Sequence, residues 1–211
     1  YVFNGHSFRT EGIEPLDWTY MDGKYISEIH NKYGDGDLNK FDNFYISDII
    51  KYKIVAGIKT ILPLNYINYS YDMVEKILKE EVNWNYYGGH HHESLLTKFV
   101  VSSYLPKKFN IDRRLTSYSA MVRAGLISKI DAKKVLQEKP ILEKDEINLQ
   151  KYILDKLDLS SEEFENIMQM KNKNFRNFKT YYNFFKYFKF PVKILYKLNF
   201  IPKLLYLRYF G

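Results

Sequence analysis

The sequence predicts an α/β fold, in which the C-terminal half of a parallel-sheet domain is followed by a mostly helical region. Near the N-terminus, short apolar runs end in Gly or Pro, as buried parallel strands do where they pass into loops. From about residue 94 onward, apolar residues recur at helical spacing behind Ser residues that can cap helices. An apolar content of 45% excludes a chain that is disordered throughout.

The first 64 residues predict strands and loops around one short helix. The segment after the first apolar run is rich in Gly, Pro and polar residues, and a loop of that length is uncommon without a function. In order, the predicted elements are a strand over 1–3, a turn at Asn4-Gly5-His6, loops over 7–24 and 31–43, a helix over 46–58 with Ser47 as N-cap, and a strand over 59–64.

The remainder of the chain up to residue 170 predicts helices with recognisable ends. Ser70, Ser128 and Ser160 stand where N-caps are expected, and Ser160 with Glu163 forms a capping-box pattern. The predicted helices cover 70–81, 94–104 with a stop near Pro106, 120–124 ending at Gly125, 129–138, 145–157 and 161–170, and a basic polar segment covers 107–119.

The basic charge of the chain is confined to its C-terminal end. Lys and Arg number 32 and Asp and Glu 25, for a net charge of +7, but ten of the basic residues follow Glu165, the last acidic one. The first 165 residues therefore hold 22 basic and 25 acidic side chains. Because a nucleic-acid-binding domain needs a basic face, we expect no nucleic-acid partner.

Three parts are expected: a partial α/β domain over 1–93, a helical substrate-side region over 94–170, and a basic aromatic tail over 171–211. The absence of Cys excludes a disulfide scaffold, a thiolate zinc site and a cysteine nucleophile, and it fits a cytoplasmic protein. No window holds the ~18–20 apolar residues of a membrane span. Because the sequence opens on Tyr1, we expect it to begin inside a longer protein.

The first candidate site follows the first predicted strand. In an open α/β sheet, ligands bind at the carboxyl ends of the strands. The motif Gly5-His6-Ser7-Phe8-Arg9-Thr10-Glu11-Gly12 would put a small turn, an imidazole and a charge pair there. A structural loop with a surface Arg–Glu pair explains the same residues, and both interpretations stay open.

The second candidate site is Tyr87-Gly88-Gly89-His90-His91-His92-Glu93. Two glycines let backbone amides approach an anion closely. A metal site is disfavoured, because adjacent side chains do not converge easily on one ion and the His-Glu-x-x-His spacing of zinc proteases is absent. Binding of an anionic substrate and a simple helix-entry loop remain as interpretations, and we expect no metal.

The third candidate site is Lys107-Lys108-Phe109-Asn110-Ile111-Asp112-Arg113-Arg114. Guanidinium groups pair bidentately with phosphate oxygens, so adjacent cations held by one Asp suit a polyphosphate. A solvated basic turn is the alternative. The apolar Phe109 and Ile111 suggest that the segment is anchored against the core, which favours a binding function.

The tail over 171–211 places Lys or Arg every few residues among aromatic and aliphatic side chains, with breaks expected at Pro191 and Pro202. A basic amphipathic stretch of this kind can lie on an anionic membrane surface. Packing on the domain or on a partner protein is the alternative, and stacking on single-stranded nucleic acid is a weaker one.

Several separated blocks make the sequence resemble the N-acetyl sugar amidotransferases of bacterial surface-polysaccharide and flagellin-glycan synthesis, which belong to the PP-loop ATP pyrophosphatase group. The blocks are GHSFRTEGIEPLDWTYMDGKYI (5–26), GIKTILPL (57–64), WNYYGGHHHES (84–94), LPKKFNIDRRLTSYSAMVRAGLISKIDA (105–132) and LSSEEFENIM (159–168). They occur in the family's order and together cover most of residues 1–170.

The resemblance implies a PP-loop fold and an enzyme that uses ATP, Mg²⁺ and ammonia to convert the acetamido group of a nucleotide-linked sugar into an acetamidino group. A separate glutamine amidotransferase subunit would supply the ammonia. Adenylation would turn the amide oxygen, a very poor leaving group, into a good one. The implied location is the cytoplasm, with peripheral contact at the inner face of the membrane if the tail binds lipid.

The resemblance also assigns site residues. His6, Arg9, Glu11, His91 and Glu93 would line the catalytic cleft, whereas Gly5, Gly88, Gly89, Lys108, Asp112, Arg113 and Arg114 would bind the nucleotide or its phosphates. The chain departs from the family where His90 replaces a usual Lys and His92 a usual Tyr. The family's Ser-Gly-Gly-x-Asp-Ser phosphate loop does not occur in these 211 residues, so we expect this chain alone to be inactive.

Two alternatives remain at this stage. A fragment of a PP-loop enzyme that modifies tRNA would share the Gly-His strand end and the strand near Pro63. A non-catalytic, membrane-associated remnant or scaffold would keep the fold and bind the amidotransferase partner.

Overall fold

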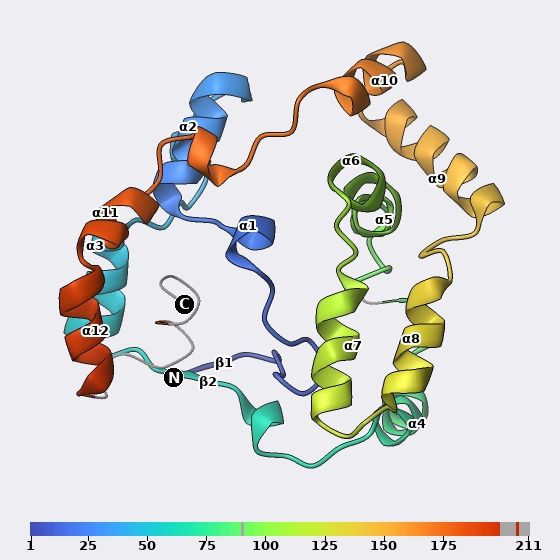
Figure 1. Cartoon of the computed structure of the whole chain (residues 1–211), viewed down its shortest axis with the longest axis horizontal. Coiled ribbons are helices and arrows are strands. Elements are labelled where there is room, and N and C mark those ends of the chain that lie inside the picture. The colour runs from blue at the N-terminus through green and yellow to red at the C-terminus, as the bar shows by residue number, and fades with distance from the viewer. Residues whose placement is uncertain (90, 199–205, 207–211) are drawn as a thin grey trace. The chain divides into compact units, whose positions relative to one another are not determined.

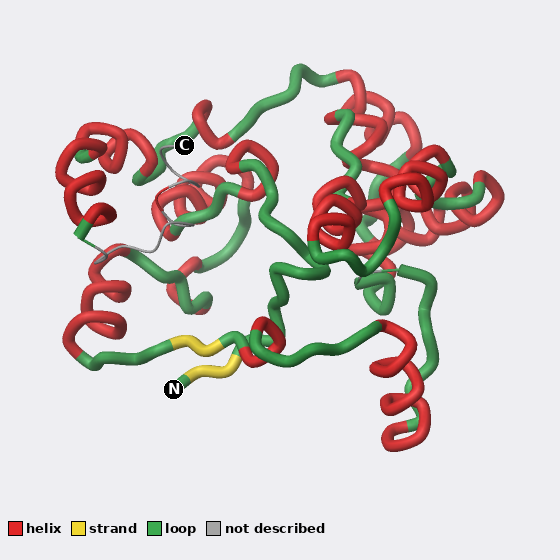
Figure 2. Tube along the Cα trace, turned by 60° about the horizontal axis from the view of Figure 1, so that its bottom comes forward, coloured by secondary structure: helices red, strands yellow, loops and turns green. Residues whose placement is uncertain are grey.

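The computed structural model of the chain describes residues 1–89, 91–198 and 206. The described residues are mostly helical, and their only strands form a two-stranded sheet (Figures 1 and 2). Strand β1 (Val2–Phe3) runs parallel to β2 (Thr60–Ile61): the N–H of Val2 donates to the carbonyl of Lys59 and that of Asn4 to the carbonyl of Ile61, each at 2.9 Å. Both predicted strands therefore form, but helices dominate, and the PP-loop type of fold stays a prediction.

The helices lie mostly after residue 70. In chain order they are α1 (Leu16–Thr19), α2 (Gly23–Tyr33), α3 (Ile46–Ile49), α4 (Tyr71–Val82), α5 (Leu95–Phe99), α6 (Leu105–Phe109), α7 (Arg114–Arg123), α8 (Lys129–Gln137), α9 (Glu143–Lys156), α10 (Ser161–Gln169), α11 (Tyr182–Tyr187) and α12 (Lys189–Lys197). Segments Ile50–Val55 and Val100–Tyr104 are π-helical, and short 3₁₀ turns cover Leu38–Lys40, Pro63–Asn65 and Phe175–Asn177.

The predicted N-caps at Ser70, Ser128 and Ser160 are confirmed. The hydroxyl of Ser70 accepts the N–H of Met73, which starts α4, and Ser128 caps α8 in the same way. At α10, Ser160 and Glu163 form the complete capping box: the hydroxyl accepts the N–H of Glu163, and the carboxylate accepts the N–H of Ser160 at 2.8 Å.

Several boundaries differ from the prediction. The helix expected to stop near Pro106 continues, because the π-helical turns before it accommodate the missing N–H and the bulk of the proline ring. Helix α7 begins at Arg114, inside the segment predicted to be irregular. The expected cap Ser47 is wrong, since Tyr45 holds the N-cap position of α3.

Helix α2 fills residues 25–30, for which no element was predicted, and its two ends extend into the predicted loops over 7–24 and 31–43. Its N-cap is Asp22, whose carboxylate accepts the N–H of Tyr25 at 2.7 Å. Inside the helix, Lys32 pairs with Glu28 at 2.8 Å in an i,i+4 arrangement.

The chain forms two compact units that do not follow sequence order. Unit 1 comprises residues 1–2, 14–60 and 173–211, and unit 2 comprises residues 3–13 and 61–172. In unit 1, the aromatic ring of Phe175 is buried and stacks on Tyr20 at 4.2 Å between ring centroids. The expected divisions at 93/94 and 170/171 stay predictions.

The core of unit 2 lies among the helices that follow residue 94. Apolar side chains of α5, α9 and α10 meet there with Ile141, and the π-helical turn packs against them. Its buried members are Phe99, Ile141, Leu149, Ile153, Leu154 and Phe164. Helices α7 and α8 pack beside each other and bury Ala120 and Ala132.

Candidate functional site

The carboxylate of Glu11 organises the loop that follows β1. Its Oε1 accepts the N–H of Ser7 at 3.0 Å, and its Oε2 lies 2.8 Å from Nδ1 of His6. Ser7 is fully buried, whereas the side chains of His6 and Glu11 are about one-third exposed. If Nδ1 carries the proton toward Glu11, Nε2 of His6 is the nitrogen that can accept another. Gly5 precedes this pair with no atom within 4 Å of the position a Cβ would take.

Arg9 ties the same loop to the segment after Asn65. Its guanidinium donates to the carbonyl of Ile67 at 3.2 Å and to Oδ1 of Asn68 at 3.1 Å, and it lies 5.7 Å from the centre of the Tyr69 ring. The expected Arg–Glu pair of the motif is thus not the main contact. Glu11 instead faces His6, and Arg9 holds the next segment.

Gly12 brings the loop against α7. Its φ of +70° is one that favours glycine, and a Cβ there would lie 2.8 Å from the carbonyl oxygen of Thr116 and 3.1 Å from Cβ of Ala120. The close approach places the first candidate motif beside the helix that begins at Arg114, in the third motif.

Two tyrosines lie near these elements, Tyr71, which is about half exposed, and Tyr118, which is partly buried. Burial raises the pKa of Tyr71 at the start of α4, and the nearby groups of Tyr69, Glu11 and Tyr118 raise it further, while a hydrogen bond with Thr10 opposes the shift. Burial also raises the pKa of Tyr118 in α7. Both phenols therefore stay protonated at neutral pH and can donate hydrogen bonds where the loop meets α7.

The described residues of the second motif form bends at 88–89 and a turn at 91–93, before α5. Gly88 has φ +91° with no neighbouring atom at the Cβ position, whereas a Cβ on Gly89 would overlap the imidazole of His92. Nδ1 of His91 lies 3.4 Å from Oε1 of Glu93, and both side chains are at least half exposed. The N–H of Glu93 itself, followed by His91, lowers the pKa of the Glu93 carboxyl. His90 lies outside the described residues.

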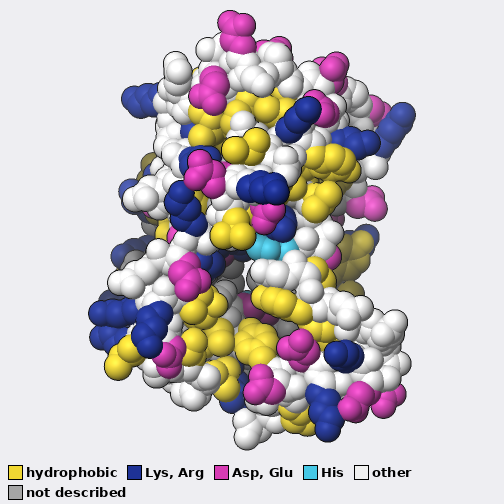
Figure 3. Space-filling view, turned by 90° about the vertical axis from the view of Figure 1, so that its right-hand side faces the viewer, with side chains coloured by type: hydrophobic (Ala, Val, Ile, Leu, Met, Phe, Trp, Pro, Cys, Tyr) yellow, Lys and Arg dark blue, Asp and Glu magenta, His cyan; other side chains and the backbone are white. Residues whose placement is uncertain are grey.

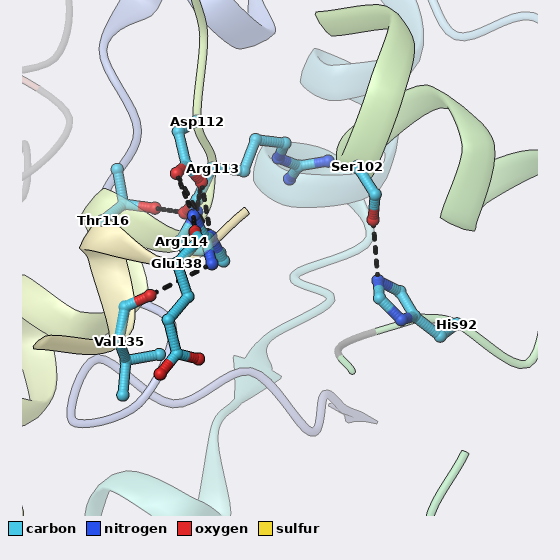
Figure 4. A network of polar contacts seen from close by, with 8 residues as sticks. All are labelled: His92, Ser102, Asp112, Arg113, Arg114, Thr116, Val135 and Glu138. Atoms are coloured by element: carbon cyan, nitrogen blue, oxygen red, sulfur yellow. Dashed lines mark hydrogen bonds and ion pairs between the residues drawn. The ribbon is translucent and has the colours of Figure 1, made fainter. Parts of the chain in front are cut away.

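His92 turns inward from this motif. Its Nε2 lies 3.2 Å from Oγ of Ser102, which is buried in the π-helical turn Val100–Tyr104 (Figure 4). π-Helical turns often occur at functional sites. The sequence did not single out Ser102, because nothing in a run of Val, Ser and Tyr marks a change in hydrogen-bond register.

Lys107 and Lys108 in α6 hold other helices of unit 2. Nζ of Lys107 lies 2.7 Å from Oε1 of Glu146 in α9. Nζ of Lys108 donates to the carbonyls of Ile167 at 2.8 Å, Met168 at 3.0 Å and Met170, at the C-terminal end of α10. An ammonium group has three donors, so these three carbonyls use all of them.

Arg114 makes similar contacts at the end of α8. Its Nη2 and Nε pair with both oxygens of Asp112 at 2.8–3.1 Å, and its two Nη atoms donate to the carbonyls of Val135 at 3.3 Å and Glu138 at 2.9 Å (Figure 4). The side chain of Arg113 extends the other way, toward Ser102 (Figure 4). Adjacent arginines thus face different surroundings, which their spacing alone does not reveal.

Every predicted site residue lies in unit 2, but the structure brings only some of them close to one another. The loop over 5–12 contacts α7 at Gly12, and Lys108 and Arg114 bind helix ends. Two open cavities lie elsewhere, one of about 330 Å³ between α5 and α9 and one of about 460 Å³ where α9 leads into α10, and no predicted site residue lines either. A single pocket shared by the three motifs stays a prediction.

Among residues 1–89, 91–198 and 206, no group of three His, Cys, Asp or Glu side chains could hold a metal ion. On the face in Figure 3, Lys and Arg alternate with Asp and Glu, and hydrophobic side chains lie between them. That face offers no extended basic surface to a polyanion.

The sequence analysis missed the tyrosines at the junction of the loop and α7. Thr10, Tyr71 and Tyr118 carry no spacing motif, and 20 Tyr in the chain make any one of them inconspicuous. Their contacts depend on the fold of unit 2, which brings residues about 60 and 110 positions apart in sequence together.

Comparison of the sequence with models of known protein families gives one match. Residues 93–190 match the model for the C-terminal domain of LPS (lipopolysaccharide) biosynthesis proteins that are WbpG-like. The match begins at Glu93, covers α5 to α11 and ends within the first residues of α12, just under half of the chain. It supports the LPS-related family predicted from the sequence blocks. No curated protein and no solved structure matches the chain.

Proposed function

We propose that the chain is part of an ATP-dependent N-acetyl sugar amidotransferase, which converts the acetamido group of a nucleotide-linked sugar to an acetamidino group during surface-polysaccharide synthesis. The observation that carries the proposal is the match of residues 93–190 to the C-terminal domain of an LPS biosynthesis family. The sequence blocks between residues 5 and 94 extend the same resemblance to the other half of the chain.

The described residues do not make a convincing ATP or Mg²⁺ site. Lys108 uses its donors on helix carbonyls, and Arg114 is paired with Asp112 and bound to the end of α8. No group of three metal-ligating side chains occurs within the described part of the chain. We therefore assign Lys108, Asp112 and Arg114 to holding the helices together and derive no step through the nucleotide.

The loop after β1 is the better candidate for chemistry in this chain. Nε2 of His6 is proposed as the base that takes a proton from ammonia as its nitrogen bonds to the carbon of the activated acetamido group. The C–O bond of that group breaks in exchange, and its oxygen would leave with the adenylyl group that ATP, when bound, would supply. Glu11 orients the imidazole through Nδ1 and stabilises the imidazolium that forms. Arg9 and the phenols of Tyr71 and Tyr118 provide hydrogen-bond donors beside the same loop for the sugar.

The test uses the full-length enzyme with the nucleotide-linked sugar, ATP and ammonium, so that the glutamine amidotransferase subunit is not needed. His6→Gln should lower the rate of acetamidino formation, followed by mass spectrometry, by about 10²- to 10⁴-fold. Glu11→Gln should lower the rate less and shift its pH profile. His30→Gln is the matched control, since His30 is a partly exposed histidine of unit 1 whose Nε2 lies 3.2 Å from the carbonyl oxygen of Gly36, outside the predicted site.

An unchanged rate in His6→Gln would refute the role of His6 but not the reaction. Failure of the unaltered enzyme to form the acetamidino product from any N-acetyl sugar nucleotide would refute the proposed function. Tight binding of tRNA in a gel-shift experiment would instead favour the tRNA-modifying alternative.

A further inference from the structure

The tail that follows residue 172 consists of two parts with different surroundings. In its first part, Phe175 is buried, Arg176 pairs with Asp17, and Lys179 lies 3.8 Å from Glu28. Nζ of Lys173 also donates to the phenol of Tyr33 at 3.0 Å. These basic residues are therefore neutralised or hydrogen-bonded within unit 1, and the first part of the tail is a structural element of that unit.

The second part, α11 and α12, exposes its apolar side chains instead. Tyr187 is 87% exposed and Phe190 73% exposed, far above the values of aromatic residues packed in a core. The other large apolar side chains exposed there are Phe184, Phe188, Ile194, Leu195 and Leu198. An apolar surface of this kind calls for a partner when its side chains are contiguous.

The spacing in α12 sorts its side chains into four rows along the helix, one of which is Pro191 and Leu195. Residues four apart lie on the same face, so Lys189, Lys193 and Lys197 form one exposed row. Phe190, Ile194 and Leu198 form the neighbouring exposed row. The half-buried row is Val192 and Tyr196, and Tyr196 stacks on Tyr206 at 4.6 Å between ring centroids. Pro191 lies within the first turn, where its missing N–H does not interrupt the helix.

We propose that α11 and α12 bind the surface of an anionic phospholipid membrane, with the Phe190 row at the level of the acyl chains and the Lys189 row among the headgroup phosphates. Basic helices with aromatic and aliphatic residues on one face bind membrane interfaces in this way. None of the helices that the structure describes is long and apolar enough to cross a bilayer.

Charge favours a lipid surface over a protein partner. No acidic residue follows Glu165 in the sequence, so nothing in α11 or α12 opposes the lysines. The interiors of protein–protein interfaces are depleted in Lys, whereas anionic headgroups attract each nearby Lys or Arg. The proposal is independent of the amidotransferase reaction.

Pro202, Lys203 and Arg208, which the tail prediction included, lie outside the described residues.

The experiment is flotation of the full chain with vesicles made of phosphatidylglycerol and phosphatidylcholine in equal parts, and with vesicles of phosphatidylcholine alone. Binding is expected only to the anionic vesicles and should weaken as the salt concentration rises. The triple variant Lys189→Gln, Lys193→Gln, Lys197→Gln should bind on the order of 100-fold more weakly, as about fivefold per cation implies.

A matched triple variant removes the same charge from the exposed lysines Lys129, Lys133 and Lys144 of unit 2 and should bind as the unaltered chain does. Phe190→Ser with Ile194→Ser should weaken binding while the lysines remain. Circular dichroism checks that each variant folds. The proposal is overturned if the two triple variants lose equal affinity, if Phe190→Ser with Ile194→Ser has no effect, or if the chain ignores anionic vesicles, which would leave a protein partner as the occupant.

Discussion

At the scale of single residues, the basic motif around Asp112 shows why cations in a sequence are ambiguous. Phosphate oxygens and the carbonyls at a helix C-terminus are both clusters of oxygen acceptors that carry negative charge. Lys108 donates to carbonyls at the end of α10, and Arg114 donates to carbonyls at the end of α8. The sequence identified cations with oxygen partners, and only the fold shows which oxygens they meet.

Lys108→Met should destabilise unit 2 by about 2 kcal/mol, because it removes the ammonium that donates to three helix carbonyls and puts in its place a thioether that cannot donate. Urea unfolding followed by circular dichroism measures the loss. Lys133→Met, on the exposed face of α8, is the control and should change stability little. Unaltered stability together with lost nucleotide binding would instead support the phosphate-binding role.

Gly12→Ala should destabilise the chain by about 2–3 kcal/mol. The methyl group would meet the carbonyl of Thr116 at 2.8 Å, and alanine is strained at φ +70°. Gly57→Ala is the matched control, with φ +63° but open space around the Cβ position, and it should cost only about 1 kcal/mol. Equal losses in the two variants would argue against a tight contact between the loop and α7.

At the scale of elements, three of the four predicted serine caps form, at Ser70, Ser128 and Ser160 but not at Ser47, whereas the predicted helix stop at Pro106 does not. Ser70, Ser128 and Ser160 begin helices because a hydroxyl satisfies a backbone N–H locally. Pro106 was expected to end a helix, but the preceding π-helical turns let the chain continue into α6. Because the chain continues as α6, Lys107 lies next to α9 and Lys108 next to α10. The partners of both lysines therefore depend on a helix that the sequence did not predict.

The link between α6 and α9 should depend on pH. Burial alone would raise the pKa of Glu146, but hydrogen bonds from Lys107 and Ser103 outweigh it and leave the pKa lowered. Because the pKa of Glu146 is lower in the folded chain than in the unfolded chain, where it is about 4.3, the pair stabilises the fold fully at a pH above that unfolded pKa. The stabilisation is lost as the pH falls through the folded-state pKa.

Glu146→Gln should therefore cost about 1–2 kcal/mol at pH 7, since Lys107 is half exposed and the pair is partly screened. The difference from the unaltered chain should shrink toward acid pH in urea unfolding. Glu143→Gln is the control, because its contact with Lys139 is 3.8 Å long and exposed. A loss of stability that stays constant down to pH 3 would contradict the assignment.

At the scale of the whole molecule, the chain separates basic residues that serve the fold from those that face outward. Lys173, Arg176 and Lys179 are engaged within unit 1, whereas Lys189, Lys193 and Lys197 form an exposed row. Composition alone describes both groups as one basic aromatic tail. In the first group, Arg176 and Lys179 lie near Asp17 of α1 and Glu28 of α2, and Lys173 donates to the phenol of Tyr33. Helices α11 and α12 contain no acidic residue that could pair with the second group.

Phe175→Ala should destabilise unit 1 by about 3–4 kcal/mol, because the ring is 3% exposed and stacks on Tyr20. Hydrogen exchange should show faster exchange in α1 and α2, which belong to the same unit, with the core of unit 2 unaffected. Phe190→Ala, at a 73% exposed position, is the control. If the backbone amides of α1 and α2 stay protected from exchange in the Phe175→Ala variant, the tail is not part of unit 1.

By itself, the sequence determined features that depend on near neighbours in the chain, such as the serine caps and the positions of the two short strands. It also determined the charge of the tail, and the match of residues 93–190 supports the LPS-related family that its blocks predicted. The tertiary structure alone decided which oxygens Lys108 and Arg114 bind, how Tyr71 and Tyr118 meet the loop at Glu11, and which lysines of the tail remain exposed. The physical reason is the distance in sequence between the partners. A capping side chain finds its N–H within four residues, whereas a long cationic or phenolic side chain binds whichever acceptor the folded chain brings within reach.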